Sequence, residues 1–386
     1  MKRKLHLWVI GLIVLAGLTG QASAQERPLS DHAVASAITC GPGNDFYLAF
    51  GHSALRIQDT AKGIDYVYNY GTFDFDTPHF YWNFARGMLN YCLSRTRFEN
   101  FLAVYDYEQR WVSEQRLNLT PQEVSNLFVM LEWNYLPENR YYQYDFFRDN
   151  CATRVRDMVE GALGKKSLGI DDGEEHSYRR WVHSATSGGC REWWVMGVDM
   201  LLGLPTDLSR SNSEAMFYPV AMMQLYDNAT INGESPLITC NKEHLADHRE
   251  PLHRSFPPTV AFALLLMLAA VLTVKGWWRP RMDRILFIIA GAVGLFLCFM
   301  WFDTDHWCTK WNLNILWASP LLILIAIRLN KSPRWALWLQ EGCFAAAAVW
   351  VIACGLSLAL IPIILTLALR VACLIPRKPQ QRQPQR

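Results

Sequence analysis

The hydrophobic residues of this chain are concentrated at its two ends. One apolar run lies within the first 20 residues, and apolar runs dominate everything after Phe256. A membrane-spanning helix needs ~20 consecutive apolar residues. By this measure the later runs predict spans near residues 257–275, 285–302 and 313–327, and the stretch from about 336 to 374 is long enough for two more. The pattern therefore predicts a globular domain followed by a membrane domain.

The charges between these runs predict how the helices cross the membrane. The second link, DTDHWCTKWN, leans acidic and is expected outside. Basic segments stay on the cytoplasmic side, and they occur in the first link (KGWWRPRMDR), the third link (RLNKSPR) and the tail (RKPQQRQPQR). The tail returns to the cytoplasm only if the stretch 336–374 crosses twice, with a break near Gly355. We therefore expect an all-α bundle of about five transmembrane helices.

The first 24 residues are typical of a secretory signal peptide. MKRK precedes an apolar core, and Ala-Ser-Ala at residues 22–24 fits the small-residue cleavage pattern. An uncleaved anchor helix is the alternative. With cleavage, the chain divides into a signal peptide (1–24), an exported domain (25–255), a transmembrane domain (256–374) and a disordered cytoplasmic tail (375–386).

Shorter patterns predict an α+β fold for the exported domain. FGHSALRI (50–57) and GIDYVYNYGTF (63–73) alternate like strands, and the turn-rich DTAKG separates them. The segment 120–136 is helical, with Thr120 and Glu123 as a capping box. The segment 150–164 is helical too, capped by Asn150 and ended by Gly164. Further helices are expected over 193–204 and 216–229.

Composition and motifs exclude several classes of function. The 386 residues are 51% hydrophobic and carry a formal net charge of +2 at pH 7. The basic residues cluster beside the predicted spans and form no stripe, so a nucleic-acid partner is not expected. The spacing of His and Cys residues shows no metal pattern, and the sequence has no P-loop or dinucleotide fingerprint. We expect no metal and no cofactor.

Cys151 is the best candidate nucleophile. By the capping argument it begins a helix, where unpaired N–H groups and the helix dipole favour a thiolate. A thiolate enzyme also needs a proton acceptor, and the acceptor needs an orienting group. Exported cysteines normally form disulfides. The exported domain holds five cysteines, however, so at least one stays free or pairs elsewhere, for which Cys308 is a candidate.

The predicted hairpin offers an acceptor and an orienting group. A register centred in the DTAKG turn places His52 opposite Asn69, and Arg56 opposite Asp65, all on one face of the sheet. That face would carry an imidazole, a side-chain amide and an ion pair. A lone histidine in a strand is more often structural. The prediction of His52 as base and Asn69 as orienting residue therefore depends on this register.

Three further residues are candidates for substrate contact. Asn150 directly precedes Cys151, while Asp305 and His306 lie in the outer link beside the membrane, where polar groups can contact lipid head groups. A solvated loop is the alternative for this link. The apolar segment 193–204 is expected either to dip toward lipid or to form an ordinary core helix.

Five segments resemble the Lnb-type lipoprotein N-acyltransferases: TCGPGNDFYLAFGHSALRI, YNYGTFDFD, LNLTPQE, PENRYYQYDFFRDNCATRVRDM and TKWNLNILWASP. The resemblance covers essentially the whole mature chain. It implies a papain-like exported domain, of the circularly permuted NlpC/P60-like type, followed by a transmembrane domain. It also implies Cys151 as nucleophile and His52 as base. The role of Asn69 rests on the register and not on the family.

The resemblance implies acyl transfer at the outer face of the inner membrane. A fatty acyl chain would pass from a phospholipid donor to a thioester on Cys151. The α-amine of S-diacylglyceryl cysteine, at the N-terminus of a lipoprotein acceptor, would then receive it. Both substrates live in the bilayer, which explains a thiol domain fused to membrane spans. A membrane-tethered cell-wall peptidase or amidase, and a non-enzymatic membrane scaffold, are the alternatives.

Overall fold

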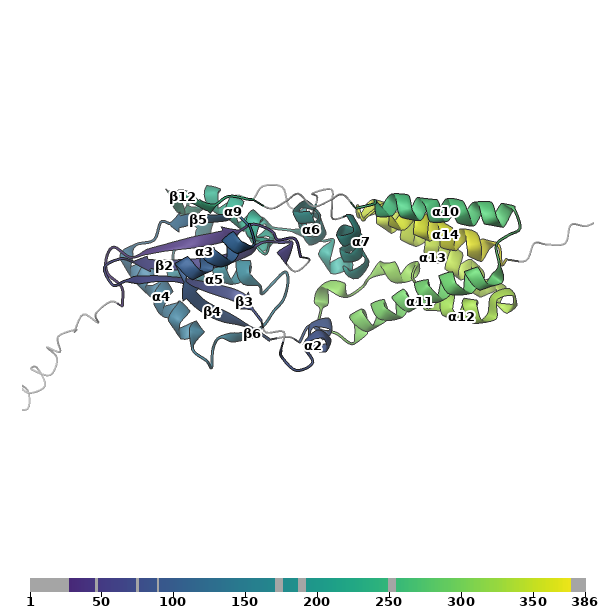
Figure 1. Cartoon of the computed structure of the whole chain (residues 1–386), viewed down its shortest axis with the longest axis horizontal. Coiled ribbons are helices and arrows are strands. Elements are labelled where there is room, and N and C mark those ends of the chain that lie inside the picture. The colour runs from purple at the N-terminus through teal and green to yellow at the C-terminus, as the bar shows by residue number, and fades with distance from the viewer. Residues whose placement is uncertain are drawn as a thin grey trace, which may run out of the picture.

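The protein consists of a sheet-rich N-terminal part and a helical C-terminal part (Figure 1). The structure is a computed structural model. It describes residues 28–45, 48–73, 76–88, 90–170, 176–186, 192–248 and 255–375. The predicted signal peptide, and the tail from residue 376 on, lie outside the described residues. The expected order, a mixed α and β domain followed by a helical region, is confirmed.

A seven-stranded antiparallel sheet forms the core of the N-terminal part, in the order β12-β5-β1-β2-β3-β4-β6. The hairpin strands β2 and β3 lie at and beside its centre. The strands are β1 (Val34–Cys40), β2 (His52–Asp59), β3 (Ile64–Thr72), β4 (Asn90–Arg97), β5 (Val112–Leu117), β6 (Tyr141–Gln143) and β12 (Ile238–Leu245).

Helices cover both faces of this sheet (Figure 1). Leu55 and Ile57 of β2 pack with α4, α5 and α9, while Ala54 packs with α3 on the other face, as the two-residue period of a strand requires. The helices of this part are α2 (Phe80–Arg86), α3 (Phe98–Tyr107), α4 (Pro121–Tyr135), α5 (Cys151–Leu163), α6 (Tyr178–Thr186), α7 (Glu192–Leu201), α8 (Asn212–Ala215) and α9 (Pro219–Asn228).

The N-terminal part also contains several short elements. A three-stranded sheet has the order β11-β10-β7, and a two-stranded one joins β8 and β9. These elements are β7 (Leu168–Gly169), β8 (His176–Ser177), β9 (Ser209–Arg210), β10 (Thr230–Ile231), β11 (Ser235–Pro236) and the 3₁₀ turn η2 (Leu204–Thr206).

The predicted helix starts are confirmed by their caps. Thr120 accepts from the backbone N–H of Glu123, and the Glu123 carboxylate accepts from the backbone N–H of Thr120, so α4 begins with a full capping box. Asn150 caps α5, which ends at Gly164. Helices α7 and α9 lie within the two further segments predicted as helical, to within a residue at the start of α7. Each of these signals is local in the sequence, which is why it could be read there.

The register of the β2–β3 hairpin is offset by two residues from the predicted one. Leu55 lies opposite Tyr68, where the prediction placed Tyr66. The reason is the turn: residues 60–63 connect the strands, and Gly63 closes the connection with φ of +66°. A connection of this length moves the centre of the hairpin by one residue along the chain. The predicted register is therefore wrong.

The side chains nevertheless lie on the predicted faces of the sheet and form the predicted pairs. Side chains in a strand alternate with period two, so an offset of two residues leaves each on its predicted face. The His52 Nε2 atom lies 3.3 Å from Asn69 Oδ1, and Arg56 forms two hydrogen bonds of 2.8 Å with the carboxylate of Asp65. Each pair is diagonal across the two strands and not directly opposite.

Arg56 is the centre of a buried ionic network. Its Nη1 lies 3.0 Å from Glu114 Oε2, its Cζ lies 3.5 Å from the centre of the Phe98 ring, and only 7% of the residue is exposed. Glu114 is also bound by His244 Nε2 at 2.5 Å. Burial alone would raise the pKa of Glu114, but these hydrogen bonds and the charge of Arg56 hold it below its usual value. The network connects β2, β3, β5, β12 and α3.

The C-terminal part contains the apolar helices α10 (Pro258–Val274), α11 (Pro280–Phe302), α12 (Leu321–Arg328), α13 (Arg334–Ala353) and α14 (Leu360–Ala372), with 3₁₀ turns η3 (Trp307–Thr309), η4 (Leu313–Leu316) and η5 (Leu329–Lys331). Three segments of the described chain are long and apolar enough to cross a membrane: α11, the run Trp307–Lys331 and α13. Helices α10 and α14 are shorter. The break predicted near Gly355 is present, with φ of +65°. The count of five crossings stays a prediction.

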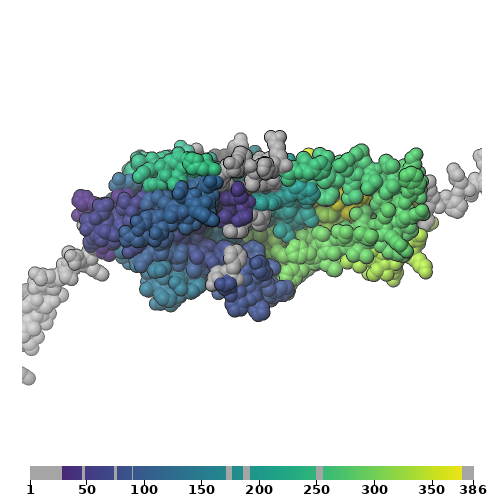
Figure 2. Space-filling model, in the orientation of Figure 1, coloured from purple at the N-terminus to yellow at the C-terminus, as the bar shows by residue number. Residues whose placement is uncertain are grey.

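The link between α11 and α12 joins the two parts of the molecule. Asn312 and Asn314 are buried in this link, and their amides donate to the backbone carbonyls of Met200 and Asp199 at the end of α7. Met196 of α7 packs into the core of the helical part. Helix α7 therefore docks on the end of the helical bundle, and the two parts meet along a continuous contact (Figures 1 and 2).

Candidate functional site

Cys151 is held in place by the sequence around the start of α5. The Asn150 side chain accepts hydrogen bonds from the backbone N–H groups of Ala152 and Thr153, and Thr153 completes the capping box. The apolar face of α5 packs on β2 and β3. This packing brings the first residue of the helix, Cys151, to the ends of the two central strands.

Cys151 and His52 line the same pocket. The pocket has a volume of about 270 Å³, and its walls are largely aromatic; they include Phe50, Phe73, Phe84, Tyr91, Tyr144 and Phe146. Arg110 also lines it. The structure thus brings together the two residues that the sequence analysis selected from positions about a hundred residues apart. Asn69 forms a hydrogen bond with the ring of His52.

The Asn69 hydrogen bond selects the form of the His52 ring. The Asn69 Oδ1 atom can only accept a hydrogen bond, so the ring nitrogen facing it, Nε2, carries the proton in the neutral ring. The other nitrogen, Nδ1, is then the unprotonated one. This arrangement leaves His52 with one free basic nitrogen, which is what a general base requires.

The Cys151 thiol is neutral in the resting site. Burial raises its pKa to about 11, although backbone N–H groups of Ser53, Ala152 and Cys151 itself donate to the sulfur and lower it. The position of Cys151 at a helix start predicts a thiolate. The donors are present as expected, but the desolvation of a thiol that is 8% exposed outweighs them.

His52 is also neutral at rest. Its pKa is lowered to about 4, mainly by burial and also by the positive charge of Arg110, while the hydrogen bond with Asn69 acts in the opposite direction. Cys151 and His52 therefore line the pocket as a neutral thiol and a neutral imidazole.

Arg110 is a residue of the site that sequence reasoning missed. It is 3% exposed, and its Nε and Nη1 donate to the Gly41 carbonyl and to Glu108 at 2.7 and 2.6 Å. Its Nη2 has no hydrogen-bond partner within the described chain. Its positive charge adds to burial, the larger cause, in lowering the pKa of His52. It lies in no motif that we had singled out, so no signal pointed to it.

A β-bulge beside the thiol was missed as well. Along the β3–β4 pair, Asn69 lies opposite Ser94 but Thr72 lies opposite Cys92, so β3 holds one extra residue here. Gly71 occupies this bulge with φ of +84°, and a Cβ on it would lie 3.7 Å from the Cβ of Cys151. Bulges often adjoin functional sites because they re-aim neighbouring side chains. The glycine in YNYGTF was its only sequence signal.

Asn150 has a structural role, which does not support the prediction of substrate contact. Its amide nitrogen donates to the carbonyls of Phe146 and Phe217, and its oxygen accepts from the two N–H groups of the α5 start. The residue is 3% exposed. All hydrogen-bonding positions of the side chain are therefore occupied within the protein.

Asp305 and His306 lie outside the pocket and connect the outer link to α2. His306 Nε2 lies 3.1 Å from the carbonyl oxygen of Phe84, and the backbone N–H of Asp305 donates to the carbonyl of Arg86. Arg86 in turn lies 3.9 Å from a carboxylate oxygen of Asp303. Since Phe84 lines the pocket, these residues hold one of its walls against the helical part.

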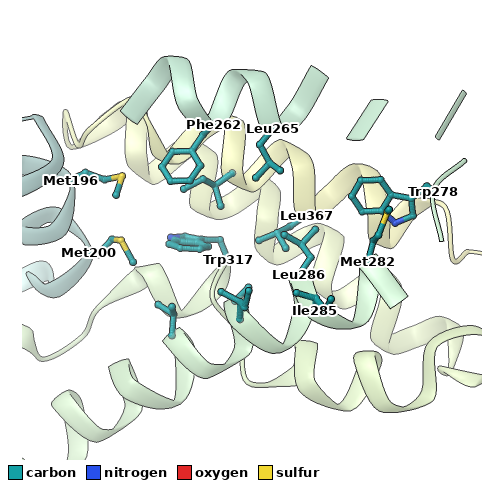
Figure 3. A pocket seen from close by; sticks show the side chains of 14 residues that line it. Met196, Met200, Phe262, Leu265, Trp278, Met282, Ile285, Leu286, Trp317 and Leu367 are labelled. Atoms are coloured by element: carbon teal, nitrogen blue, oxygen red, sulfur yellow. The ribbon is translucent and has the colours of Figure 1, made fainter. Parts of the chain in front are cut away.

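A second cavity lies among the helices of the C-terminal part. It has a volume of about 520 Å³ and runs from Met196 and Met200 at one end to Trp278 and Met282 at the other (Figure 3). All 14 of its lining residues are apolar. The two tryptophan N–H groups are used elsewhere, by Asp283 and Asn314. The cavity can hold hydrocarbon, but it has no group that could carry out a reaction.

The described residues show neither a cluster of metal-ligating side chains nor a disulfide. They contain no group of three or more His, Cys, Asp or Glu side chains that could hold a metal ion. Nine of the ten cysteines lie in the described chain, and all nine are free thiols there, Cys308 included. Cys190 lies outside the described residues.

The chain matches two family models. Residues 22–183 match the Lnb N-terminal periplasmic domain, and residues 250–380 match the Lnb transmembrane domain. No curated protein and no solved structure matches the chain. The first match contains His52, Asn69 and Cys151, and the second contains the helical part and its outer link. The two matches occur in the family's order and cover most of the sequence, and on this basis the chain belongs to the Lnb-type lipoprotein N-acyltransferase family.

Proposed function

We propose that this protein moves a fatty acyl chain from a membrane phospholipid to the N-terminal amine of a lipoprotein, through a thioester on Cys151. One observation carries the proposal: a buried thiol and a neutral imidazole line one aromatic pocket, and a wall of that pocket is held by the membrane part. Family membership suggests an acyltransferase. Both proposed substrates are membrane lipids, so a pocket at this junction is where they could meet a thiol.

The first half-reaction acylates the enzyme. The Cys151 sulfur attacks the carbonyl carbon of the phospholipid ester while Nδ1 of His52 takes the thiol proton. Backbone N–H groups that now face the sulfur, those of Ser53 and Ala152, are placed to stabilise the oxyanion that forms. The ester C–O bond breaks, and the leaving oxygen takes the proton from His52. The products are a Cys151 thioester and a lysophospholipid.

The second half-reaction transfers the chain to the acceptor. The α-amine of an S-diacylglyceryl cysteine attacks the thioester carbonyl, and His52 removes a proton from the attacking nitrogen. The C–S bond breaks, and the proton returns to the sulfur. The products are an N-acylated lipoprotein and the free Cys151 thiol. The 520 Å³ cavity among the helices is apolar enough to hold a lipid chain of a substrate.

The architecture supports the finer assignments. A cysteine at the start of a helix that packs on an antiparallel sheet, with a histidine on a strand, is the arrangement expected of a papain-like domain. We assign residues 25–255 to this domain, 256–374 to a multi-pass inner-membrane domain with five crossings, and 1–24 and 375–386 to the signal peptide and tail. The domain match places the N-terminal domain in the periplasm.

Lipoproteins from a strain that lacks this protein test the proposal. Mass spectrometry of their N-terminal peptides should show loss of the amide-linked acyl chain and retention of the diacylglyceryl group. Unchanged lipoproteins together with altered wall peptides would show a cell-wall peptidase instead. If neither the lipoproteins nor the wall peptides change, the result would favour a non-enzymatic membrane scaffold.

The pH dependence of Cys151 acylation should follow the low pKa of His52. His52 must be unprotonated to act as the base. In the folded protein its pKa is about 4, whereas an ordinary histidine has a pKa of 6.5. We expect the acylation rate to hold well below pH 6.5 and to fall only as the pH nears 4. Rates measured from about pH 4 to pH 9 would show this. Half-loss at or above pH 6.5 would contradict it.

The same shift affects stability. The unfolded chain protonates His52 near pH 6.5 and the folded protein only near 4, so the neutral ring favours folding at higher pH. This contribution is fully present above pH 6.5 and is lost as the pH falls toward 4. Replacing His52 with phenylalanine should reduce the acid sensitivity of the melting temperature in this window, as thermal unfolding at stepped pH would record.

Asn69 should act as a positioning residue. Asn69→Ala removes one neutral hydrogen bond, worth about 1 kcal/mol, so acylation should slow roughly fivefold. His52→Ala should slow it by about 10²–10⁴-fold. Asn69→Asp keeps an acceptor but adds a charge beside the ring, which should raise the pKa of His52 and move the acid limb of the rate profile upward. An unchanged profile in Asn69→Asp would show that Asn69 supports the fold and not the base.

A further inference from the structure

Helix α2 combines high exposure with large apolar side chains. The helix has seven residues, and Phe80 is its one buried residue. Tyr81 is 79% exposed, Trp82 55% and Phe84 53%, and Met88 just beyond the helix is 43% exposed. Side chains of this kind in water forgo the favourable free energy of burying their apolar surface. An exposed apolar cluster of this kind indicates an interaction surface that contacts a protein or a membrane.

The position of α2 beside the end of α11 indicates that the lipid bilayer covers this surface. The Trp82 ring lies 5.7 Å from the ring of Phe299, which is three residues from the end of α11. The carbonyls of Phe84 and Arg86 bind the outer link at His306 and Asp305. Figures 1 and 2 show α2 projecting from the sheet domain beside the end of α11. The helix therefore lies level with the outer end of a membrane helix.

The composition of this surface fits the boundary between lipid and water. Tyrosine and tryptophan are enriched there because one edge of each ring is polar. Between residues 79 and 88, HFYWNFARGM, the segment has no acidic residue and one arginine, Arg86. Phe296 and Phe302 of α11 extend the apolar surface, at 48% and 74% exposure. A short apolar helix of this kind lies in the interface with its aromatic face in the acyl layer.

Aromatic contacts connect α2 to the thiol pocket. Phe80 packs on Phe73 at 5.7 Å between ring centres, and Phe73 packs on Tyr91 at 5.2 Å. Tyr91 stacks on Tyr144 at 4.3 Å. Three of these rings, with Phe84 of α2 itself, line the pocket that holds Cys151. An apolar wall thus runs from the exposed face of α2 to the reacting sulfur.

From these contacts we infer that α2 inserts into the outer leaflet and is the access route by which a phospholipid acyl chain reaches Cys151. The occupant of this surface is the bilayer itself. The inference rests on the proposed function for the chemistry at Cys151, but the contact of α2 with lipid stands without it. Asp305 and His306 act here by docking α2 and not by binding a head group.

A double variant, Tyr81→Ser with Trp82→Ser, tests the route. The full-length protein is reconstituted in vesicles of phosphatidylethanolamine and phosphatidylglycerol, and thioester formation on Cys151 is followed by intact mass. Loss of two apolar contacts with lipid should slow acylation by vesicle phospholipid by at least about tenfold. Acylation by p-nitrophenyl butyrate, which reaches the pocket from water, should not change. Tyr107→Ser, at a residue that is 90% exposed on α3, is the matched control.

The two donors separate the outcomes. Equal losses with both donors would show that α2 shapes the pocket, and an unchanged rate with vesicles would show that α2 is not the route. Either result overturns the inference. If the wild-type protein forms no adduct with either donor, it is the proposed function that fails.

Photo-crosslinking tests the lipid contact without any catalysis. With p-benzoylphenylalanine in place of Tyr81, irradiation of native membranes should give phospholipid adducts, and the same group in place of Tyr107 should give none. Adducts to protein alone at position 81 would show that a partner protein covers α2, and the inference would be wrong.

Discussion

The Cys151→Ala variant is expected to lose acyl transfer by about 10³-fold or more, because the proposed route has no other nucleophile to carry the chain. The variant should fold and insert normally, since the substitution removes one sulfur atom from the lining of an existing pocket. In phospholipid micelles without acceptor, the wild-type mass should rise by one fatty acyl group. Hydroxylamine should remove the group, and peptide mapping should place it on Cys151.

Cys240→Ala provides the control, because Cys240 is an exposed thiol on β12 and does not line the pocket. Acylation of this variant should equal that of the wild type. An active enzyme that never forms the adduct would refute the thioester, and so would a Cys151→Ala variant that still acylates lipoprotein. Direct transfer between the two lipids would then be the remaining route.

The largest loss of stability is expected for Arg56→Ala. The substitution removes the partner of Asp65 and one partner of Glu114, which is 9% exposed. Breaking a buried pair from one side costs about 3–5 kcal/mol, because the remaining charge stays buried without its partner. The melting temperature of the full-length protein in detergent should fall by roughly 10 °C. Circular dichroism would record the change.

Arg97→Ala, at the end of β4 in the same sheet, is the matched control. Arg97 and Glu99 also form an ion pair, but their side chains are 52% and 71% exposed. Exposed pairs contribute about 0–1 kcal/mol, so the melting temperature should hardly change. Equal shifts for the two variants would show that burial is not what gives the Arg56 network its importance.

The parts of this structure that could be predicted are those determined by neighbouring residues. The caps at Thr120 and Asn150 act over three residues, and both are present. The faces of the hairpin follow from the period of a strand, so His52 and Asn69 meet even though the register is offset. The turn ends at Gly63, which has a positive φ. The segment DTAKG contains several residues that favour turns, so the sequence alone does not show at which of them the turn ends.

The parts that could not be predicted depend on contacts between distant residues. Arg110 reaches the pocket because β1 and β5 are paired in the sheet, a pairing that no local pattern specifies. The outer link was expected to meet lipid head groups or solvent, yet it holds α2 through contacts more than two hundred residues apart in sequence. Burial, which raises the pKa of Cys151, is likewise a property of the assembled fold.

Contacts with the outer link also determine when, during synthesis of the chain, the turn before Cys151 can reach its final packing. Trp307 donates to Asp145 at 2.6 Å and lies under the guanidinium of Arg148, so it packs against the turn that leads into α5. These residues are 162 positions apart, an interval that a ribosome covers in roughly 8–30 s at about 5–20 residues per second. The turn before Cys151 is therefore exported well before the tryptophan that supports it. The turn before Cys151 therefore acquires its final packing only after α11 and the link that follows it have been made.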